Sequence, residues 1–418
     1  MPTNLVPLDL GIQIPYHFRC PISLELMRDP VTVCTGQTYD RTSIESWVSI
    51  GNTTCPVTRA PLSDFTLIPN HTLRRLIQEW CVANRSYGVE RIPTPKQPAD
   101  PTSVRALLSQ ASATSGAHVS VRSRAAALRR LRGFARDSDK NRVLIAAHNA
   151  GEILIRILFN SVNDSSELVS ESLALLVMFP ITDPESIASD PNRVEFLTRL
   201  LYDSSIETRV NAAALIEMVL TGTKSSDLKE AISNSESVFQ GVLDILRNPI
   251  SSYPRRALKI GIKALFALCL SKTARHIAVF SGAPEILIDR LASDFDRCET
   301  ERALATVELL CRSPEGCAAF GDHALTVPLL VKTILRVSDR ATEYAAGALL
   351  AICTAEERWR EEAAAAGVVV QLLLMVQSEC TERAKKKAQK LLKLLRDSWP
   401  DYSFANSHHF ACSQVVPF

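Results

Sequence analysis

The sequence predicts a mainly α-helical protein in which a small α+β domain, built like a zinc ring but without the zinc, precedes a solenoid of helical repeats. Three observations support this prediction. Residues 14–88 follow the order of a loop, a hairpin, a helix, a second loop and a closing helix. The cysteines and histidines in that segment stand singly, so the paired ligands that a zinc ring needs are missing. From Val104 onward almost every window has the apolar period of a helix.

Length and composition indicate an ordinary soluble protein with more than one domain. The chain has 418 residues, a formal charge of +2 and 22% charged residues, a balance that does not favour nucleic-acid binding. Its start lacks the basic and apolar regions of a secretory signal. The 11 cysteines are scattered and mostly lie in helical patterns, which is typical of buried thiols in a reducing compartment. We therefore expect a cytosolic protein, with the nucleus as the alternative, and no metal or cofactor.

The longest nearly uninterrupted apolar run covers residues 363–376, or 14 positions. A membrane span needs roughly 20 apolar residues. We therefore predict that this run forms a buried helix and that the chain has no integral membrane segment.

In the first domain, the central helix has recognisable ends. It should start at Asp40, a good N-cap, and stop at Gly51, which tolerates the left-handed turn after a helix. Ile44 and Val48 lie four residues apart and are assigned to the core, whereas Trp47 falls off that stripe and can reach the surface. Residues 1–13, before this domain, carry no periodic signal and are expected to form a flexible lead-in.

The closing helix of the first domain should begin at Asn70. Its residues recur at i, i+3, i+4 and i+7, the spacing of one helix face. That apolar face is predicted to fold back on the domain and consists of Leu73, Leu76, Ile77 and Trp80.

A proline-rich segment, residues 89–103, follows the first domain. Pro93, Pro95, Pro98 and Pro101 prevent a helix there, so the segment is predicted to be a stiff linker. Within it, Thr94 lies three residues after an arginine, a spacing that basophilic kinases accept. Thr94 is therefore a candidate phosphorylation site, with an unmodified linker threonine as the alternative.

Residues 104–396 contain an internal repeat. Apolar helices recur with steps of 41, 45, 45, 42 and 43 residues, beginning at Gly151, Asn192, Ser237, Gly282, Ala324 and Gly367. Alanine-rich helices such as residues 211–219 and 345–353 lie between them and allow close packing. A single repeat cannot bury its apolar face, so the repeats must stack. The period predicts about six repeats of the armadillo type, with a concave groove.

Two basic runs, residues 122–136 and 383–396, are interpreted as polar faces of helices. The second run also has the sign that acidic lipid headgroups or acidic partners attract. A terminal capping helix, with one face buried and one solvated, explains it equally well. Its buried face is predicted to consist of Ala384, Ala388, Leu391, Leu392 and Leu395, and residues 397–418 to form a flexible tail.

The first domain resembles a U-box. The resemblance rests on the run CPISLELMRDPV, on GQTYDR, on Ile44 and Trp47, and on TCPVTR and PNHTLRRLIQEW, which match the U-box pattern along its whole length. Together with the repeats, residues 14 to 396 are similar to the plant U-box/armadillo ubiquitin ligases. This resemblance implies a ring-type ubiquitin transferase without a covalent intermediate. It also implies stress and defence signalling through proteasomal turnover of a substrate.

The resemblance further implies the partners. A ubiquitin-conjugating enzyme loaded with ubiquitin would dock on the U-box, and a protein substrate would lie in the armadillo groove. Holding both in one reactive arrangement accelerates acyl transfer, because restricted orientation lowers the barrier. Dimerisation, with itself or with a relative, is left open.

By resemblance, the docking surface combines the first loop, the central helix and the second loop. Ile22 and Trp47 would supply apolar contact, although both could instead pack inside the domain. Arg59 is the predicted linchpin, because in such ligases a basic residue here hydrogen-bonds both the conjugating enzyme and ubiquitin; a solvated surface arginine is the alternative. Leu24 and Pro56 complete the predicted surface.

In place of zinc, polar groups must brace the loops. Exposed ion pairs contribute little on average, so only a desolvated, hydrogen-bonded network would matter. The candidates for this structural role are Ser23, Glu25, Asp29, Asp40 and Arg41, with Val31 as a core position.

Three other functions fit parts of the sequence. A non-catalytic armadillo adaptor would have lost docking residues, yet Ile22, Trp47, Pro56 and Arg59 are all present. A nuclear-import receptor would carry repeated tryptophan–asparagine arrays, which the repeats lack. Nucleic-acid binding would rest on basic helix faces without interleaved aromatic residues. A ubiquitin ligase is the predicted function, with the adaptor as the alternative.

Overall fold

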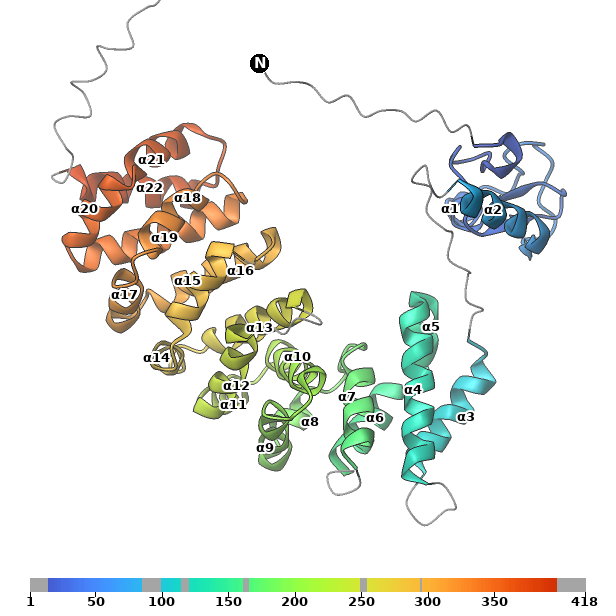
Figure 1. Ribbon diagram of the computed structural model, residues 1–418, viewed down its shortest axis with the longest axis horizontal. Helices are drawn as coiled ribbons and strands as arrows, with labels where there is room; N and C mark the ends of the chain where they lie inside the picture. Colours follow the sequence, from blue (N-terminus) through green and yellow to red (C-terminus); the bar gives the residue numbers. More distant parts are fainter. Residues whose placement is uncertain are drawn as a thin grey trace, which may run out of the picture. The chain divides into compact units, whose positions relative to one another are not determined.

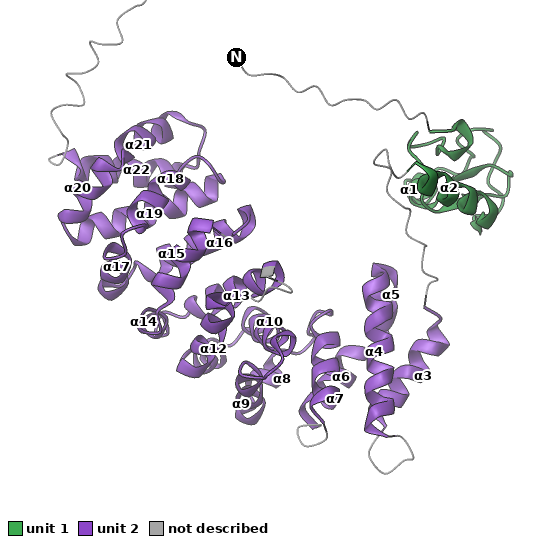
Figure 2. Ribbon diagram, viewed as in Figure 1, with its two compact units in different colours: residues 1–97 green, residues 98–418 purple. Residues whose placement is uncertain are grey.

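The computed structural model, shown in Figure 1, describes residues 14–84, 99–113, 120–160, 165–248, 254–293 and 295–396. The chain divides into two compact units, residues 1–97 and 98–418 (Figure 2). The predicted lead-in, Thr94 with most of the predicted linker, and the predicted tail lie outside the described residues.

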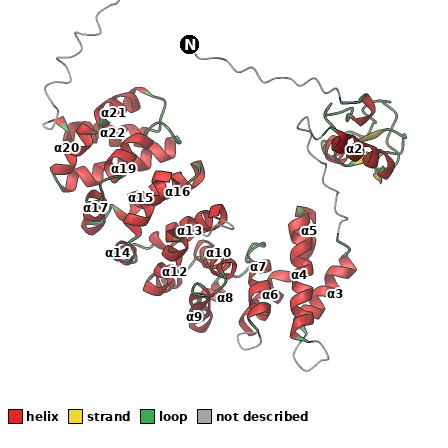
Figure 3. Ribbon diagram, in the orientation of Figure 1, coloured by secondary structure: helices red, strands yellow, loops and turns green. Residues whose placement is uncertain are grey.

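Unit 1 is a small α+β domain with a three-stranded antiparallel sheet (Figure 3). Val31 pairs with Tyr39 on one side and with Pro69 on the other, which gives the strand order β2-β1-β3. The elements of unit 1 are η1 (Tyr16–Phe18), β1 (Pro30–Thr32), β2 (Thr38–Asp40), α1 (Arg41–Ser49), β3 (Ile68–Pro69) and α2 (His71–Ala83).

The core of unit 1 joins the sheet to both helices. Val31, Tyr39, Ile44 and Ile77 are fully buried, and Val48 packs at the edge of this cluster. Burial of Ile44 therefore follows the helical spacing of the sequence. Helix α1 ends where predicted, because Gly51 takes a left-handed φ of 99° just after its last turn.

The predicted buried face of α2 is wrong at one residue, Leu76. Asn70 caps the helix as expected, since its side-chain oxygen accepts a hydrogen bond from the Leu73 amide at 3.0 Å. Leu76, however, is 48% exposed, and Cys81 is buried in the core instead. Each residue turns the helix by about 100°, so Leu76 lies well round the helix from Ile77, on which the buried stripe is centred.

The secondary structure of unit 2 is helical throughout its described residues. Its first helix begins at Pro101, inside the segment predicted to be linker. Pro101 occupies the first helical turn, where a backbone N–H would have no partner within the helix. The Asp100 side chain caps the helix by accepting a hydrogen bond from the Ser103 amide. The helices are α3 (Pro101–Ser112), α4 (Val121–Asp137), α5 (Asp139–Ala146), α6 (Ala150–Asn160), α7 (Ser166–Leu176), α8 (Glu185–Ala188), α9 (Pro191–Leu200), α10 (Ile206–Gly222), α11 (Ser226–Ser233), α12 (Glu236–Arg247), α13 (Pro254–Cys269), α14 (Arg275–Phe280), α15 (Ala283–Ser293), α16 (Arg297–Leu310), α17 (Pro314–Gly321), α18 (Thr326–Thr333), α19 (Asp339–Ala355), α20 (Arg358–Ala365), α21 (Val368–Gln377) and α22 (Glu382–Leu394).

From α5 onward the helices form six repeats of three, from α5–α7 to α20–α22. The apolar helices predicted from the sequence are the second members, α6, α9, α12, α15, α18 and α21. The alanine-rich helices are third members, and each contacts the next in a row that runs α4, α7, α10, α13, α16, α19, α22. The short first helices were not predicted. One hydrophobic core runs through all the repeats, so the stack of helices in Figure 1 is continuous.

The apolar run at residues 363–376 is not one buried helix. Gly367 takes a left-handed φ of 79° and separates α20 from α21, and Val370, Leu373 and Leu374 on α21 are exposed. Among the described helices, none is by itself long and apolar enough to cross a membrane; α5 and α6 pass such a test only as a pair that bends by 74°. The final helix, α22, buries Ala384, Ala388 and Leu391 as predicted.

Close packing at Gly321, the last residue of α17, generates a prediction. A β-carbon there would overlap the indole ring of buried Trp359, so Gly321→Ala should destabilise unit 2 by about 1–3 kcal/mol through overpacking. Gly151→Ala on α6 is the matched control, because its β-carbon meets open space. That control should be neutral or stabilising by about 0.5–1 kcal/mol. Thermal unfolding of both variants measures the difference, and an unchanged midpoint for Gly321→Ala would contradict the packing.

Candidate functional site

The two loops of unit 1 are copies of one turn. In the first loop, the Cys20 amide donates to the Glu25 carbonyl at 2.8 Å and the Leu24 amide to the Cys20 carbonyl at 2.8 Å. In the second loop, the Cys55 amide donates to the Ala60 carbonyl at 2.8 Å and the Arg59 amide to the Cys55 carbonyl at 2.9 Å. The sequences Cys-Pro-Ile-Ser-Leu-Glu and Cys-Pro-Val-Thr-Arg-Ala therefore fold alike.

Leu24 and Arg59 occupy equivalent positions at the tips of these turns. Both have a φ of 60°, and both side chains are exposed. A non-glycine residue in a strained backbone region costs about 1–3 kcal/mol and persists where the surrounding structure enforces it. The turn hydrogen bonds provide that enforcement, so one apolar and one cationic side chain are held outward in fixed positions.

Two buried sulfur atoms hold the turns in place. The Cys20 sulfur accepts a hydrogen bond from the Asp40 amide at 3.3 Å. The Cys55 sulfur accepts one from the Thr35 hydroxyl at 3.3 Å and pairs with the Tyr39 hydroxyl at 3.0 Å. The Tyr39 oxygen in turn accepts from the Val57 amide at 3.2 Å, and its hydroxyl hydrogen is available to donate to Cys55. The thiols thus link both loops to the hairpin.

These contacts shift the acidity of the groups involved. Burial raises the pKa of Cys55, but hydrogen bonds from Thr35, Thr58 and Tyr39 outweigh it and bring that pKa down to about 6. Burial, and then the hydrogen bond to Cys55, raises the pKa of Tyr39. A pKa of about 6 favours the thiolate of Cys55 at neutral pH, and a charged acceptor makes stronger hydrogen bonds than a neutral one.

Asp40 and Asp29, two of the predicted acidic braces, make charge-assisted contacts. The Asp40 carboxylate accepts hydrogen bonds from the backbone amides of Arg28 at 2.7 Å and Asp29 at 2.9 Å. The Arg41 guanidinium pairs with the Asp29 carboxylate at 2.7 Å. The first loop, the hairpin and α1 are thereby joined by charge-assisted hydrogen bonds.

The other two braces contribute differently. Glu25 is exposed and supplies its backbone carbonyl to the turn, while its carboxylate has no partner among residues 14–84 and the described helices of unit 2. Ser23 makes a local bond, in which its hydroxyl oxygen accepts from the Glu25 amide at 3.4 Å. Within the same described residues, no three His, Cys, Asp or Glu side chains converge as a metal site would require.

The structure places the predicted docking residues on the first loop, α1 and the second loop. Ile22 and Trp47 are half-buried and pack against the core, and Pro56 is half-buried as well. The Trp47 indole N–H donates to the Thr54 carbonyl at 2.8 Å, so this side chain ties α1 to the second loop. Trp47 therefore packs partly against the core and keeps part of its surface exposed, and its docking role stays a prediction.

Sequence reasoning missed Cys20, Cys55, Tyr39 and Thr35 as bracing residues. The signal that would have found them is the repeated Cys-Pro pair, each followed by a β-branched residue and a hydroxyl residue. Val57 was missed as a surface residue. It corresponds to Ile22 in the other turn and is 49% exposed.

Comparisons with known families and proteins cover the whole chain. The U-box domain model matches residues 14–86, and the model of the plant U-box protein ARM repeat region matches residues 103–415. The chain is 87% identical over 424 residues to U-box domain-containing protein 25 of Arabidopsis thaliana, with 100% of both chains covered. It is 35% identical over 407 residues to E3 ubiquitin-protein ligase PUB23 of Arabidopsis thaliana, with 94% of this chain and 95% of the relative covered.

Solved structures share the fold of the repeats. A structure from a study of the interaction between cadherin and beta-catenin aligns with a TM-score of 0.57 at 18% identity, covering 80% of this chain and 59% of that chain. An engineered protein aligns with a TM-score of 0.50 at 22% identity, covering 70% and 68%. The predicted fold class, a U-box followed by an α-solenoid of armadillo repeats, is confirmed.

Removing one hydroxyl should loosen the second loop. Tyr39→Phe leaves the Cys55 sulfur with one partner fewer and the Val57 amide with none, which should cost about 1–3 kcal/mol. Amide hydrogen exchange at Cys55 and Arg59 should accelerate accordingly. Tyr16→Phe is the control, because Tyr16 is 90% exposed. Equal exchange in the two variants would contradict a bracing role for Tyr39.

Cys55 should titrate near neutrality. Cysteine ¹³Cβ shifts of the full chain should show Cys55 ionising with a pKa of about 6, while Cys353, buried in unit 2, has its pKa raised to about 12. The thiol of an unfolded cysteine has a pKa of about 8.5. Between pH 6 and that value, the native state therefore binds fewer protons at Cys55 than the unfolded state does. The stabilisation is therefore complete above the unfolded pKa and is lost as pH falls through 6. A Cys55 that remains a thiol at pH values well above neutrality would refute the thiolate-centred network.

Proposed function

Because this chain belongs to the plant U-box proteins that carry an armadillo-repeat region, we propose that it is a ubiquitin-protein ligase whose U-box binds a ubiquitin-loaded conjugating enzyme. The observation that carries this proposal is the pair of matched turns, which hold Leu24 and Arg59 exposed at their tips. A fixed, exposed pair of side chains suits a docking surface, since little side-chain and loop ordering has to occur on binding.

The proposed chemistry needs no nucleophile on this chain. The conjugating enzyme carries ubiquitin as a thioester on its own cysteine, and a substrate lysine attacks that thioester. The bond to the cysteine sulfur breaks as the amide bond to lysine forms. The ligase contributes by restricting the orientation of its partners, and this restriction lowers the barrier.

Each predicted docking residue has a distinct part in this proposal. Leu24, Ile22 and Val57 offer apolar surface from the two loops, and Trp47 adds the exposed part of its ring. Pro56 stiffens the second loop. Arg59 would bridge the conjugating enzyme and ubiquitin, because a guanidinium has five donors and stays charged near neutral pH.

The repeats would recruit the substrate, for proteasomal degradation in stress and defence signalling. PUB23 is a relative whose name states a ligase activity, and it matches this chain across both units.

The ten cysteines of the described residues form no disulfide, which supports a cytosolic or nuclear location. Pairing with a second copy or with a relative is compatible with this function, and the non-catalytic adaptor is the alternative.

Arg59→Ala should separate docking from catalysis. Loss of hydrogen bonds to a charged group costs about 1.5–3 kcal/mol, so discharge of ubiquitin from the conjugating enzyme to free lysine should slow about tenfold or more while binding of that enzyme is retained. Arg75→Ala is the control, since Arg75 lies exposed on α2 and pairs with Glu79 at the surface. Unchanged discharge in Arg59→Ala would remove the bridging role. A wild-type chain that is silent across a panel of conjugating enzymes would favour the adaptor.

A further inference from the structure

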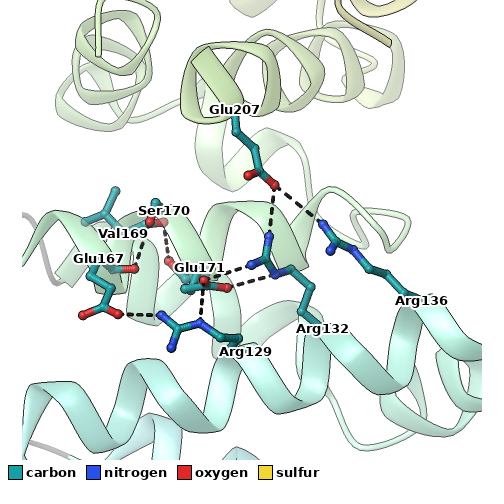
Figure 4. Close-up of polar contacts among 9 residues, drawn as sticks. Arg129, Arg132, Arg136, Glu167, Val169, Ser170, Glu171 and Glu207 are labelled. Carbon is teal, nitrogen blue, oxygen red and sulfur yellow. Dashed lines mark hydrogen bonds and ion pairs between the residues drawn. The ribbon is translucent and has the colours of Figure 1, made fainter. Parts of the chain in front are cut away.

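A row of arginines on α4 faces the neighbouring repeats. Arg129, Arg132 and Arg136 recur at i, i+3 and i+7, so they share one face of the helix. Figure 4 shows them reaching towards glutamates on α7 and α10. This corrects the interpretation of residues 122–136 as a merely solvated polar face.

Part of this row is explained by stability alone. Arg132 is mostly buried and bonds Glu171 at 2.9 Å and Glu207 at 3.0 Å. It therefore links α4 to α7 and α10. Arg129 likewise bonds Glu167 and Glu171. For these two guanidinium groups, a structural role is sufficient.

Arg136 and Arg256 are not explained in this way. Arg136 reaches Glu207 only at 3.6 Å, and its side chain is 58% exposed. The Arg256 guanidinium, on α13, donates to the neutral side-chain oxygen of buried Asn211. Arg132 is shared between Glu171 and Glu207, and Glu207 is also the ion-pair partner of Arg136. Among the described residues, the direct partner of Arg256 is therefore a neutral amide and not a carboxylate.

These groups line one cavity of about 430 Å³ between α4, α7, α10 and α13. Of its lining residues, Arg132, Arg136 and Arg256 are basic and Glu207 is the acidic one. Apolar side chains, among them Met178, form the remaining wall. Desolvation by these walls lowers the pKa of Arg256, Glu207 opposes that shift, and Arg136 and Arg132 add to it. With Glu171 paired to Arg132 from outside the lining, the three guanidinium groups exceed the neighbouring carboxylates by one positive charge.

We propose that this cavity binds the oxyanion of an acidic or phosphorylated side chain in a substrate segment lying across the third helices. The inference rests on the proposed recruitment of substrates by unit 2 and specifies their chemistry. A carboxylate or phosphate between Arg136 and Arg256 would accept paired hydrogen bonds from planar guanidinium groups. The apolar wall would contact the aliphatic stem that carries the anion.

The test uses the full-length chain and three labelled libraries of short degenerate peptides, with phosphoserine, glutamate or serine fixed at the centre. Fluorescence anisotropy at low and high KCl measures binding. We expect the phosphoserine or glutamate library to bind about tenfold more tightly than the serine library, with the preference weakening as salt rises. Tighter binding of phosphoserine than of glutamate identifies phosphorylated substrates, and equal binding of the two identifies acidic ones.

Arg256→Ala and Arg136→Gln should each reduce the preference for the anionic libraries about tenfold. Arg255→Ala is the matched control, because Arg255 precedes Arg256 on α13, is exposed as Arg256 is, and does not line the cavity. Arg136→Gln keeps the test valid if Arg256→Ala fails to fold. Equal binding of all three libraries by the wild type, or an undiminished preference in a folded variant, would overturn the proposal.

Discharge of ubiquitin to free lysine distinguishes failure of this inference from failure of the ligase function. That reaction requires the U-box and no substrate segment, so all three arginine variants should discharge at the wild-type rate. Normal discharge without any anionic preference would refute the cavity assignment alone. Absent discharge in the wild type would count against the proposed function itself.

Discussion

Unit 1 depends on sulfur atoms that act as buried hydrogen-bond acceptors. Its sheet has short strands and its two loops are long, so secondary structure by itself supplies few constraints on the loops. Cys20 and Cys55 supply them, since each receives donors from the hairpin or its turn. A buried polar group that lost such a partner would carry an unrecovered desolvation cost. The position of every proposed docking residue on the loops follows from these contacts.

Unit 2 achieves order by a different means. Each repeat buries its apolar face against the next, and the third helices form one unbroken row. Charged side chains then act between repeats, as Arg132 does when it bonds glutamates on both α7 and α10. Because most of the packing lies between neighbouring repeats, stability accumulates along the row, and side chains on the third helices can vary where they face outward. This freedom permits basic side chains to gather at one cavity.

Features that depend on residues close together in the sequence could be predicted, whereas features that depend on residues far apart in the sequence could not. The second helices of the repeats were predicted because their apolar period extends over several turns, whereas α8, with 4 residues, is too short to show one. Asp29, Asp40 and Arg41 were recognised as braces because charged residues in a small domain without metal ligands need partners. The sequence does not predict the thiol contacts, because Cys20 and Cys55 meet their partners on the hairpin only in the folded domain, 16 to 20 positions away in the chain. The cavity could not be predicted, since Arg136, Glu207 and Arg256 come from three helices far apart in the sequence, α4, α10 and α13.

The left-handed backbone at Leu24 and Arg59 restricts what evolution can place at the tips of the two turns. Valine, isoleucine and threonine are disfavoured there for steric reasons that have nothing to do with any partner, because branching at the β-carbon crowds a positive φ. Unbranched side chains, asparagine, aspartate and glycine are the accessible alternatives. Sequence divergence can therefore change the charge or the length of the side chain at each tip, but the backbone limits which residue types are tolerated there.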